Sequence, residues 1–328
     1  MNHLLRFGSI LLLVPLLFVA ACGDDGGDDD TATSTTPTAT GAASVDLSKD
    51  DLGRSVTVPA NPQRIVAMSP SIVELMFAVG ATPVGRPSSA DYPEAAKQVP
   101  NFGTSRAPNL EALIAMKPDL IISDAILDDQ AKISSLSSLG APVFAVRVAS
   151  FKDVPHSLRL VGALTGKKEA GETQAKALET KMADIKAKLP AQRPSVLVLV
   201  AAGQGQFIAS RGNSYLGDIL KEMGANNLVT SEPENFGYPG FTDYSPERII
   251  EKNPDVIITS SIGGPPGTPK TIDLLKQTPA FANLKAVKEG RVYEVDPFVY
   301  IQSAGPRVAQ ILNELPGYLY PNVFASGR

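Results

Sequence analysis

An internal repeat is the feature that most limits how this chain of 328 residues can fold. Residues 109–122 recur as residues 245–258, and each copy reads as a helix N-cap, a short amphipathic helix, a Pro-Asp break and an apolar strand. A second pair of helical patterns, ending at Gly80 and Gly224, comes before the first pair in the same order. Two motif pairs in one order predict two similar α/β lobes.

Short apolar strands alternate with helical patterns through both halves of the chain. The predicted strands are residues 64–68, 83–85, 120–123 and 143–146 in the first half, and 195–200, 207–209, 256–259 and 292–295 in the second. This alternation predicts an α/β fold whose parallel sheets are covered by helices on both faces.

Residues 168–189 predict one long helix between the two halves. They are rich in Ala, Lys, Glu and Leu, and they contain no Gly or Pro after Gly171. Such a helix would be roughly 30 Å long, and Pro190 and Pro194 mark its end. We therefore expect an N-terminal lobe over residues 45–166, an inter-lobe helix over 167–190 and a C-terminal lobe over 191–328.

The first residues read as an export signal. Arg6 precedes an apolar run over residues 10–21, which is shorter than the roughly 20 residues that span a bilayer and fits the apolar part of a signal peptide. The run ends in small residues before Cys22, the only cysteine of the chain. This segment resembles the lipobox of bacterial lipoproteins. That resemblance implies removal of residues 1–21, acylation of Cys22 and a lipid anchor on the outer side of the cell membrane. The alternative is an ordinary cleaved signal with an incidental cysteine.

The composition after the signal excludes several classes of protein. Residues 22–44 follow the signal with Gly, Asp, Thr, Ala, Ser and Pro and without apolar periodicity, so they predict a disordered tether. A net charge of -4 argues against a nucleic-acid binder. His156 is the only histidine after the signal, which excludes a metal site built from several imidazoles. No cofactor is predicted.

Enzyme motifs are incomplete. Gly203 and Gly205 follow a strand like the start of a dinucleotide loop, but the third glycine is missing. Residues 103–107 match only half of a hydrolase nucleophile elbow, and no strand directly precedes them. A lone histidine on a helix beside leucines, as at His156 with Leu158 and Leu160, is more often structural than catalytic. We therefore expect a protein that is not an enzyme.

The chain resembles a known family in several ordered segments. These are residues 53–59, 62–66 and 74–80, the two repeat copies and residues 290–296. Together they resemble the periplasmic binding proteins that serve ABC importers of iron–siderophores, haem and cobalamin, and the resemblance covers nearly everything after residue 50. It implies two Rossmann-like lobes joined by one backbone helix, a ligand between them and little hinge motion.

Glu111 and Glu247 occupy the same place in the two repeat copies. The family resemblance implies that these two carboxylates dock onto arginines of the permease dimer, which works with its ATPase. The alternative is that both only cap their helices and compensate the helix dipole, since each lies in a predicted first turn.

The ligand should lie where loops leave the carboxyl ends of the strands. The candidate binding residues there are arginines and aromatics: Arg86, Arg106, Arg147, Arg211, Tyr215, Tyr238, Phe241, Phe298 and Tyr300. The same loops carry Ser88, Tyr92, Thr104, Ser105, Asp124, Phe151, Gln204, Gln206, Phe236 and Gln302. Arginines beside aromatics suit a large, anionic, partly apolar ligand such as a ferric chelate, although any one arginine could instead be a solvated surface cation.

Departures from the family pattern rank the ligands. Haem-binding relatives often carry tyrosine in a Gly-Tyr-x-Arg segment, whereas here Gly103 is followed by Thr104 and Arg106 is retained. Cobalamin-binding relatives place aromatics near positions that Ser89 and Ser105 occupy here. An iron–siderophore therefore ranks first, a corrinoid second and haem third. A ligand-sensing surface lipoprotein with the same lobes is the remaining alternative.

Overall fold

The computed structural model describes residues 45–203, 206–230, 232–235, 237–262 and 269–324. The predicted signal peptide, Cys22 and most of the predicted tether therefore lie outside the described residues. All described residues belong to one compact unit, which contains two separate sheets. No helix in these ranges is both long and apolar enough to cross a membrane.

The first sheet is entirely parallel. Its strands β1 (Ile65–Ala67), β2 (Leu120–Asp124) and β3 (Val143–Val146) lie in that order, and every residue in them is buried. Burial on both faces is what a parallel sheet covered by helices requires. The predicted strand at residues 83–85 forms only a single bridge between Val66 and Gly85. The helices of this half are α1 (Pro70–Ala78), η1 (Glu94–Gln98), α2 (Leu110–Ala115), α3 (Gln130–Ser137) and α4 (Asp153–Leu164).

The second sheet is mixed. Its strands are β4 (Ser195–Gly203), β5 (Gln206–Ser210), β6 (Asn226–Asn227), β7 (Phe241–Tyr244), β8 (Val256–Ser260) and β9 (Val292–Val295), in the order β7-β5-β4-β8-β9 with β6 beside β4. Strands β8 and β9 run parallel to β4, as predicted, and the short β6, which was not predicted, is parallel to it as well, whereas β5 pairs antiparallel with both β4 and β7. Too few residues separate β4 from β5 for the crossover that a parallel pair needs, which is a dozen or more.

Helices follow the strands of the second half as well. They are α6 (Tyr215–Glu222), α7 (Pro246–Lys252), α8 (Thr271–Gln277), η2 (Pro279–Phe281), α9 (Lys285–Lys288), η3 (Phe298–Gln302) and α10 (Val308–Leu319). The predicted α/β fold with parallel sheets is thus confirmed, and the antiparallel edge β5-β7 is an addition to it.

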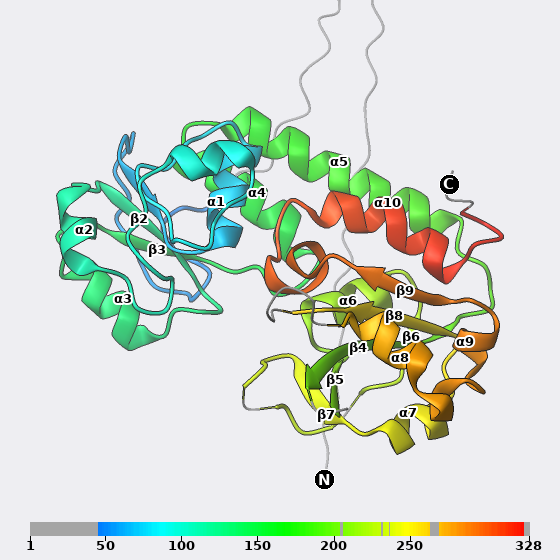
Figure 1. Ribbon diagram of the computed structural model, residues 1–328. Coiled ribbons are helices and arrows are strands. Elements are labelled where there is room, and N and C mark those ends of the chain that lie inside the picture. Colours follow the sequence, from blue (N-terminus) through cyan, green and yellow to red (C-terminus); the bar gives the residue numbers. More distant parts are fainter. Residues whose placement is uncertain (1–44, 204–205, 231, 236, 263–268, 325–328) are drawn as a thin grey trace, which may run out of the picture. The chain divides into compact units, whose positions relative to one another are not determined.

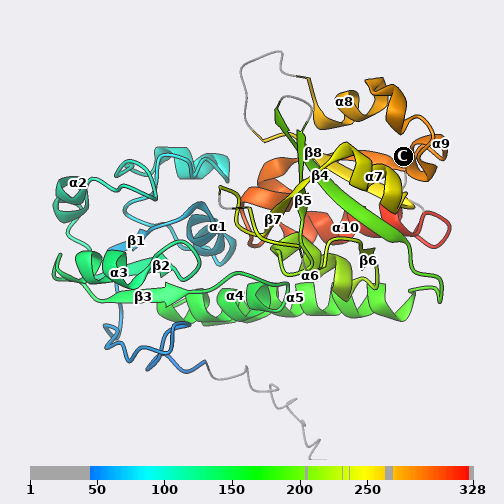
Figure 2. The ribbon, with the colours of Figure 1, turned by 90° about the horizontal axis from the view of Figure 1, so that it is seen from below.

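Helix α5 (Lys168–Ala187) lies where residues 168–189 predict a helix. It packs along α4 and also contacts α10, and it passes both sheets (Figures 1 and 2). One hydrophobic cluster contains Ile122 of the first sheet, Leu178 and Met182 of α5, and Val196 and Ile258 of the second sheet. The core is therefore continuous from one sheet to the other. The lobe boundaries placed at residues 166 and 190 remain predictions.

The two repeat copies fold alike in detail. The Asn109 side chain accepts the N–H of the third residue along at 3.1 Å to cap α2, and Ser245 caps α7 in the same way at 3.4 Å. Each helix is followed by a non-glycine residue in the left-handed region, with φ 47° at Lys117 and φ 40° at Asn253. Both residues lie directly before the Pro-Asp pair. The two copies therefore share a strained left-handed residue after the helix as well as an N-cap before it.

The aspartate of each Pro-Asp pair fastens the repeat to the first strand of its half. Asp119 accepts the N–H of Arg64 at 2.9 Å, and Asp255 accepts the N–H of Ser195 at 2.8 Å. Burial opposes ionisation of Asp255, but Lys285 and Ser195 outweigh it and lower the pKa of this carboxyl to about 2. The Pro-Asp pair is thus a structural joint in both halves.

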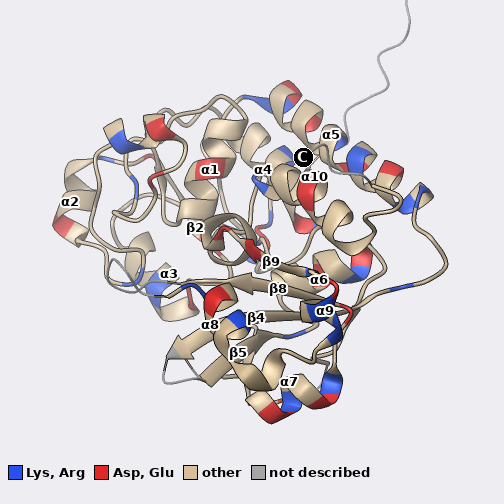
Figure 3. Cartoon of the chain, turned by 45° about the vertical axis from the view of Figure 1, so that its right-hand side comes forward, with Lys and Arg blue, Asp and Glu red and all other residues tan. Residues whose placement is uncertain are grey.

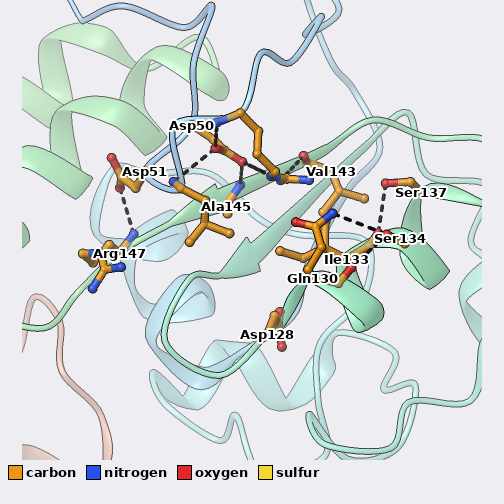
Figure 4. Close-up of polar contacts among 12 residues, drawn as sticks. Asp50, Asp51, Asp128, Gln130, Ile133, Ser134, Ser137, Val143, Ala145 and Arg147 are labelled. Carbon is orange, nitrogen blue, oxygen red and sulfur yellow. Dashed lines mark hydrogen bonds and ion pairs between the residues drawn. The ribbon is translucent and has the colours of Figure 1, made fainter.

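The segment that follows the predicted tether is fixed to the edge of the first sheet. Asp50 accepts the N–H of Ala145 at 3.2 Å, and Asp51 accepts the N–H of Arg147 at 2.8 Å (Figure 4). Asp51 also lies 3.0 Å from Nε2 of His156 on α4. These contacts hold the start of the folded body against β3 and α4.

Candidate ligand-binding site

A cavity of about 680 Å³ lies at the carboxyl ends of strands from both sheets, and its volume is within the roughly 300–1,000 Å³ typical of small-molecule sites. Its walls come from the start of α1, the loops that precede α2, the segment after β2 and the segment between β9 and α10. The lining residues are Pro70, Glu74, Ser89, Asp91, Tyr92, Thr104, Ser105, Arg106, Leu127, Asp296, Phe298, Gln302, Ser303 and Arg307.

A buried ion pair forms one wall of the cavity. Arg307 donates through Nε and Nη2 to the two carboxylate oxygens of Glu74, at 2.8 and 2.6 Å, and Ser303 donates to Glu74 at 2.8 Å. Glu74 is only 2% exposed, and burial raises the pKa of its carboxyl against the opposing effect of Arg307 and Ser303. The Tyr92 ring covers the guanidinium of Arg307 at 4.6 Å. Arg307 is therefore largely occupied by protein groups.

Helix α3 holds the loop before α2 that carries Arg106. Lys132 donates to the carbonyl of Ser105 and pairs with Asp128 at 2.5 Å. Thr104 accepts the N–H of Ala107 at 3.1 Å, which closes a tight turn. Arg106 is exposed on this turn and has no ion pair with another described residue. It can therefore reach a molecule in the cavity.

Large apolar side chains stand half-exposed in the cavity wall. Tyr92 is 51% exposed and Phe298 is 53% exposed, and Leu127 is similarly open. Apolar groups that are open to solvent within a concave site mark a surface that a ligand can cover. The cavity thus combines apolar walls with a few charged groups.

The structure brings together two of the nine candidate binding residues, Arg106 and Phe298. Of the wider set, Tyr92, Thr104, Ser105 and Gln302 also line the cavity. Among the described residues of the second half, those that line the cavity belong to the segment between β9 and α10.

The other three arginines lie elsewhere. Arg86 is buried and donates to the carbonyls of Val99 and Pro87 at 3.1 Å each. Its guanidinium therefore holds together the segment of residues 86–99, which follows α1. Arg147 is exposed beside β3, where its backbone meets Asp51. Arg211 directly follows β5 of the second sheet, and its Nη1 lies 3.6 Å from Oε1 of Glu234.

The remaining aromatic candidates are packed away from the cavity or stand outside it. The hydroxyl of Tyr300 donates to Glu314 at 2.8 Å, and its ring is in the core. Phe241 packs in a small apolar cluster of β4, β5 and β7, and Tyr215 packs against the main core from the first turn of α6. Tyr238 is exposed in the turn before β7. Gln204 and Phe236 lie outside the described residues.

The lining residues that were not among the sequence candidates are Pro70, Glu74, Ser89, Asp91, Leu127, Asp296, Ser303 and Arg307. A signal existed for Glu74, because it is the only charged residue in the apolar segment 70–79. A carboxylate in a helix that is otherwise apolar must find a buried partner, so its presence predicts a cation nearby. Nothing local in the sequence identifies Arg307 as that cation, since it follows Glu74 by 233 residues.

Neither Glu111 nor Glu247 is among the residues that line the cavity. Both are exposed in the first turns of α2 and α7, and Figure 3 shows acidic residues on each of these helices. Hydrogen bonding to Ser245 lowers the pKa of the Glu247 carboxyl, as expected near a helix N-terminus. An exposed isoleucine follows each glutamate by three residues, namely Ile114 and Ile250. The repeat thus presents the same acidic and apolar pair twice.

The geometry agrees with comparisons to known proteins. The family model described as "Periplasmic binding protein" matches residues 65–298, which is most of the chain. The chain belongs to the periplasmic binding protein family. The same match contains the whole of both repeat copies and most of the cavity lining. The chain is therefore a substrate-binding protein of ABC transport and not an enzyme.

Three similar proteins illustrate the family. The Fe(3+)-citrate-binding protein of Bacillus subtilis is 28% identical over 314 residues, which are 90% of each chain. The vitamin B12-binding protein of Salmonella choleraesuis is 28% identical over 201 residues, which are 61% of this chain and 73% of that protein. The crystal structure of an ABC transporter substrate-binding protein from Listeria monocytogenes superposes with a TM-score of 0.66 at 25% identity, over 80% of this chain and all of that one.

Proposed function

We propose that this protein binds an iron–siderophore complex outside the cytoplasmic membrane and delivers it to an ABC permease. The observation that carries the proposal is the cavity, which has half-exposed apolar walls and lies where strand ends of both sheets meet. The similarity to a ferric citrate-binding protein over 90% of the chain supports a ferric chelate as the cargo class.

A corrinoid is the second candidate, supported by the vitamin B12-binding relative. That relative matches a smaller part of the chain than the ferric citrate-binding protein does. A corrinoid with its nucleotide loop is also bulkier than a ferric chelate, so more of it would project from a cavity of about 680 Å³. Haem ranks third, because the loop before α2 has Thr104 where haem-binding relatives often have a tyrosine.

Delivery requires a surface that the permease can recognise. Glu111 and Glu247 supply two equivalent carboxylates at the starts of α2 and α7, and Ile114 and Ile250 add an apolar contact beside each. We assign these residues to docking on arginines of the permease dimer. Capping and docking are compatible, because the helix dipole stabilises the same negative charge that the permease arginines would contact.

Retention at the membrane is assigned to Cys22. The cysteine directly follows the apolar run of the signal, and the folded body begins some twenty residues later. The intervening residues have the composition of a flexible linker, which would let the body reach the permease while the lipid stays in the bilayer.

The test is a thermal-shift screen of residues 42–328 with ferric siderophores, a corrinoid and haem. A ligand at 100 times its dissociation constant should stabilise the native state by about 2.7 kcal/mol. Stabilisation by a ferric siderophore and not by the corrinoid or haem is the expected result. Stabilisation by the corrinoid alone would establish the second candidate, and no response to any ferric complex would refute the proposed cargo.

A further inference from the structure

The cavity is not positively charged, although a cleft lined by the predicted arginines would have been. Three carboxylates and two guanidinium groups line it: Glu74, Asp91, Asp296, Arg106 and Arg307. Its ionised groups therefore sum to one negative charge. Arg86 pairs with Asp91 at 3.3 Å without lining the cavity, and counting it brings the sum to zero. The internal residues outside the described ranges carry no charged side chain, so they leave this balance unchanged.

Of the two lining guanidinium groups, one is already used. Nε and Nη2 of Arg307 donate to Glu74, and Tyr92 covers one face of the group. Glu74 already neutralises the charge of Arg307, so a ligand carboxylate at the remaining N–H groups would meet a paired cation, and displacing Glu74 would leave a buried carboxylate unpaired. Arg106 remains available, but Asp91 and Asp296 share the cavity with it.

The apolar part of the wall points to the same kind of ligand. Tyr92, Leu127 and Phe298 each expose about half of their surface, and all three line the cavity. These side chains gain most from a ligand with a hydrocarbon periphery. A polyanionic chelate would place charge against apolar groups and carboxylates, and both contacts disfavour it.

We infer that this cavity selects ferric chelates with no net charge or one positive charge, of the hydroxamate class, and rejects polyanionic chelates such as ferric tricatecholates. The inference rests on the proposed function and narrows its ligand. The charge balance around Arg106 and Arg307 would then set specificity, and the apolar wall would supply most of the affinity.

A matched series of probes directly tests this dependence of binding on ligand charge, which we call the charge rule. The ferric complex of a linear trihydroxamate that ends in an ammonium group is compared with its N-acetyl and N-succinyl derivatives. These probes keep the iron centre and change only the terminal charge, from positive to none to negative. Isothermal titration calorimetry on residues 42–328 should give similar dissociation constants for the first two. The succinyl derivative should bind roughly tenfold more weakly, and a ferric tricatecholate more than about a hundredfold more weakly.

A double variant checks that the cavity carboxylates cause the discrimination. Asp91→Asn with Asp296→Asn removes two negative charges from exposed side chains, and it should bring the succinyl derivative to within about threefold of the acetyl derivative. The control, Asp184→Asn with Asp273→Asn, makes the same change in net charge on α5 and α8 and should leave the ratio as in the wild type. Higher salt should shrink the wild-type ratio.

The outcomes separate the inference from the proposed function. If the hydroxamate series binds without regard to terminal charge, or if the succinyl derivative or the tricatecholate binds most tightly, the charge rule is wrong while the ferric-chelate function stands. An unchanged ratio in the cavity double variant would also overturn the rule. If no ferric chelate binds at all, the proposed function fails and the inference fails with it.

Discussion

Glu74 and Arg307 form a two-point ion pair between α1 and the start of α10, with N···O distances of 2.8 and 2.6 Å. The two residues are 233 positions apart, and each comes from a different half of the chain. Ser303 completes the hydrogen bonding of the carboxylate. This contact joins the two halves at the wall of the ligand cavity.

Glu74→Ala should lower the free energy of unfolding by about 3–5 kcal/mol, because it leaves the largely buried guanidinium of Arg307 without its partner. Glu74→Gln keeps one acceptor oxygen for Arg307 and the shape of the side chain, so it should cost less. Urea denaturation of residues 42–328 measures both, with Asp184→Asn as a surface control that should change little. A loss below about 1 kcal/mol for Glu74→Ala would show that water reaches Arg307.

Lys117→Gly should raise the free energy of unfolding by about 0.5–1 kcal/mol, because Lys117 holds a left-handed conformation at φ 47° that glycine adopts without strain. The matched control is Lys181→Gly in the exposed middle of α5, which should lower stability by about 1 kcal/mol. Urea denaturation again supplies the measurement. If both substitutions destabilise the protein equally, the left-handed exit of α2 carries no strain.

The pKa of His156 should lie above its ordinary value of 6.5, chiefly because the Asp51 carboxylate hydrogen-bonds to its ring. A raised pKa in the folded state means that the pair stabilises the protein fully below 6.5 and that this contribution disappears as the pH rises through the folded pKa. His156 is the only histidine after the signal, so NMR gives one titration curve. Asp51→Asn should lower the midpoint, and Asp153→Asn should lower it less. A midpoint unaffected by Asp51→Asn would contradict the pairing.

Glu111→Lys combined with Glu247→Lys should abolish uptake while leaving the dissociation constant of the ligand unchanged. The reversed charges would repel the permease arginines, whereas both positions lie outside the cavity lining. Transport into cells or vesicles and calorimetry on the isolated body measure the two effects. Glu169→Lys with Asp184→Lys on α5 is the charge-matched control and should transport normally. Normal uptake by the docking variant would leave the glutamates with a capping role alone.

Cys22→Ser should release the protein from the membrane without changing ligand affinity, because the cysteine precedes Val45, the first described residue, by more than twenty positions. Membrane fractionation follows the release, and intact mass of the wild-type protein reports the acyl groups. Membrane retention of the variant would refute the lipid anchor.

The sequence predicted those parts of the fold that depend on local patterns. The two repeat copies, their N-caps at Asn109 and Ser245, seven of the eight predicted strands and the long helix α5 all follow from periodicity and capping residues, and the structure has them at nearly those positions. The strand at residues 207–209 was predicted, but its antiparallel direction was missed, although the short connection after Gly203 contained the information.

The lining of the candidate cavity was predicted less well, because side-chain partners are decided by contacts between distant segments. Arg86 and Arg106 look alike in the sequence, yet one is consumed by backbone carbonyls while the other stands free on its turn. Arg307 was overlooked because its importance derives from Glu74, which no local pattern connects to it. The position of the cavity could be expected from strand ends, but its charge could not.

The continuous core along α5 has a consequence for how the body melts. The same apolar cluster contains residues of both sheets and of α5. Neither sheet could lose its packing without exposing the face of α5 that the other also covers. Residues 42–328 should consequently unfold in one cooperative step, with matching calorimetric and van't Hoff enthalpies. A ligand that touches only the cavity wall would then raise the melting temperature of every element at once.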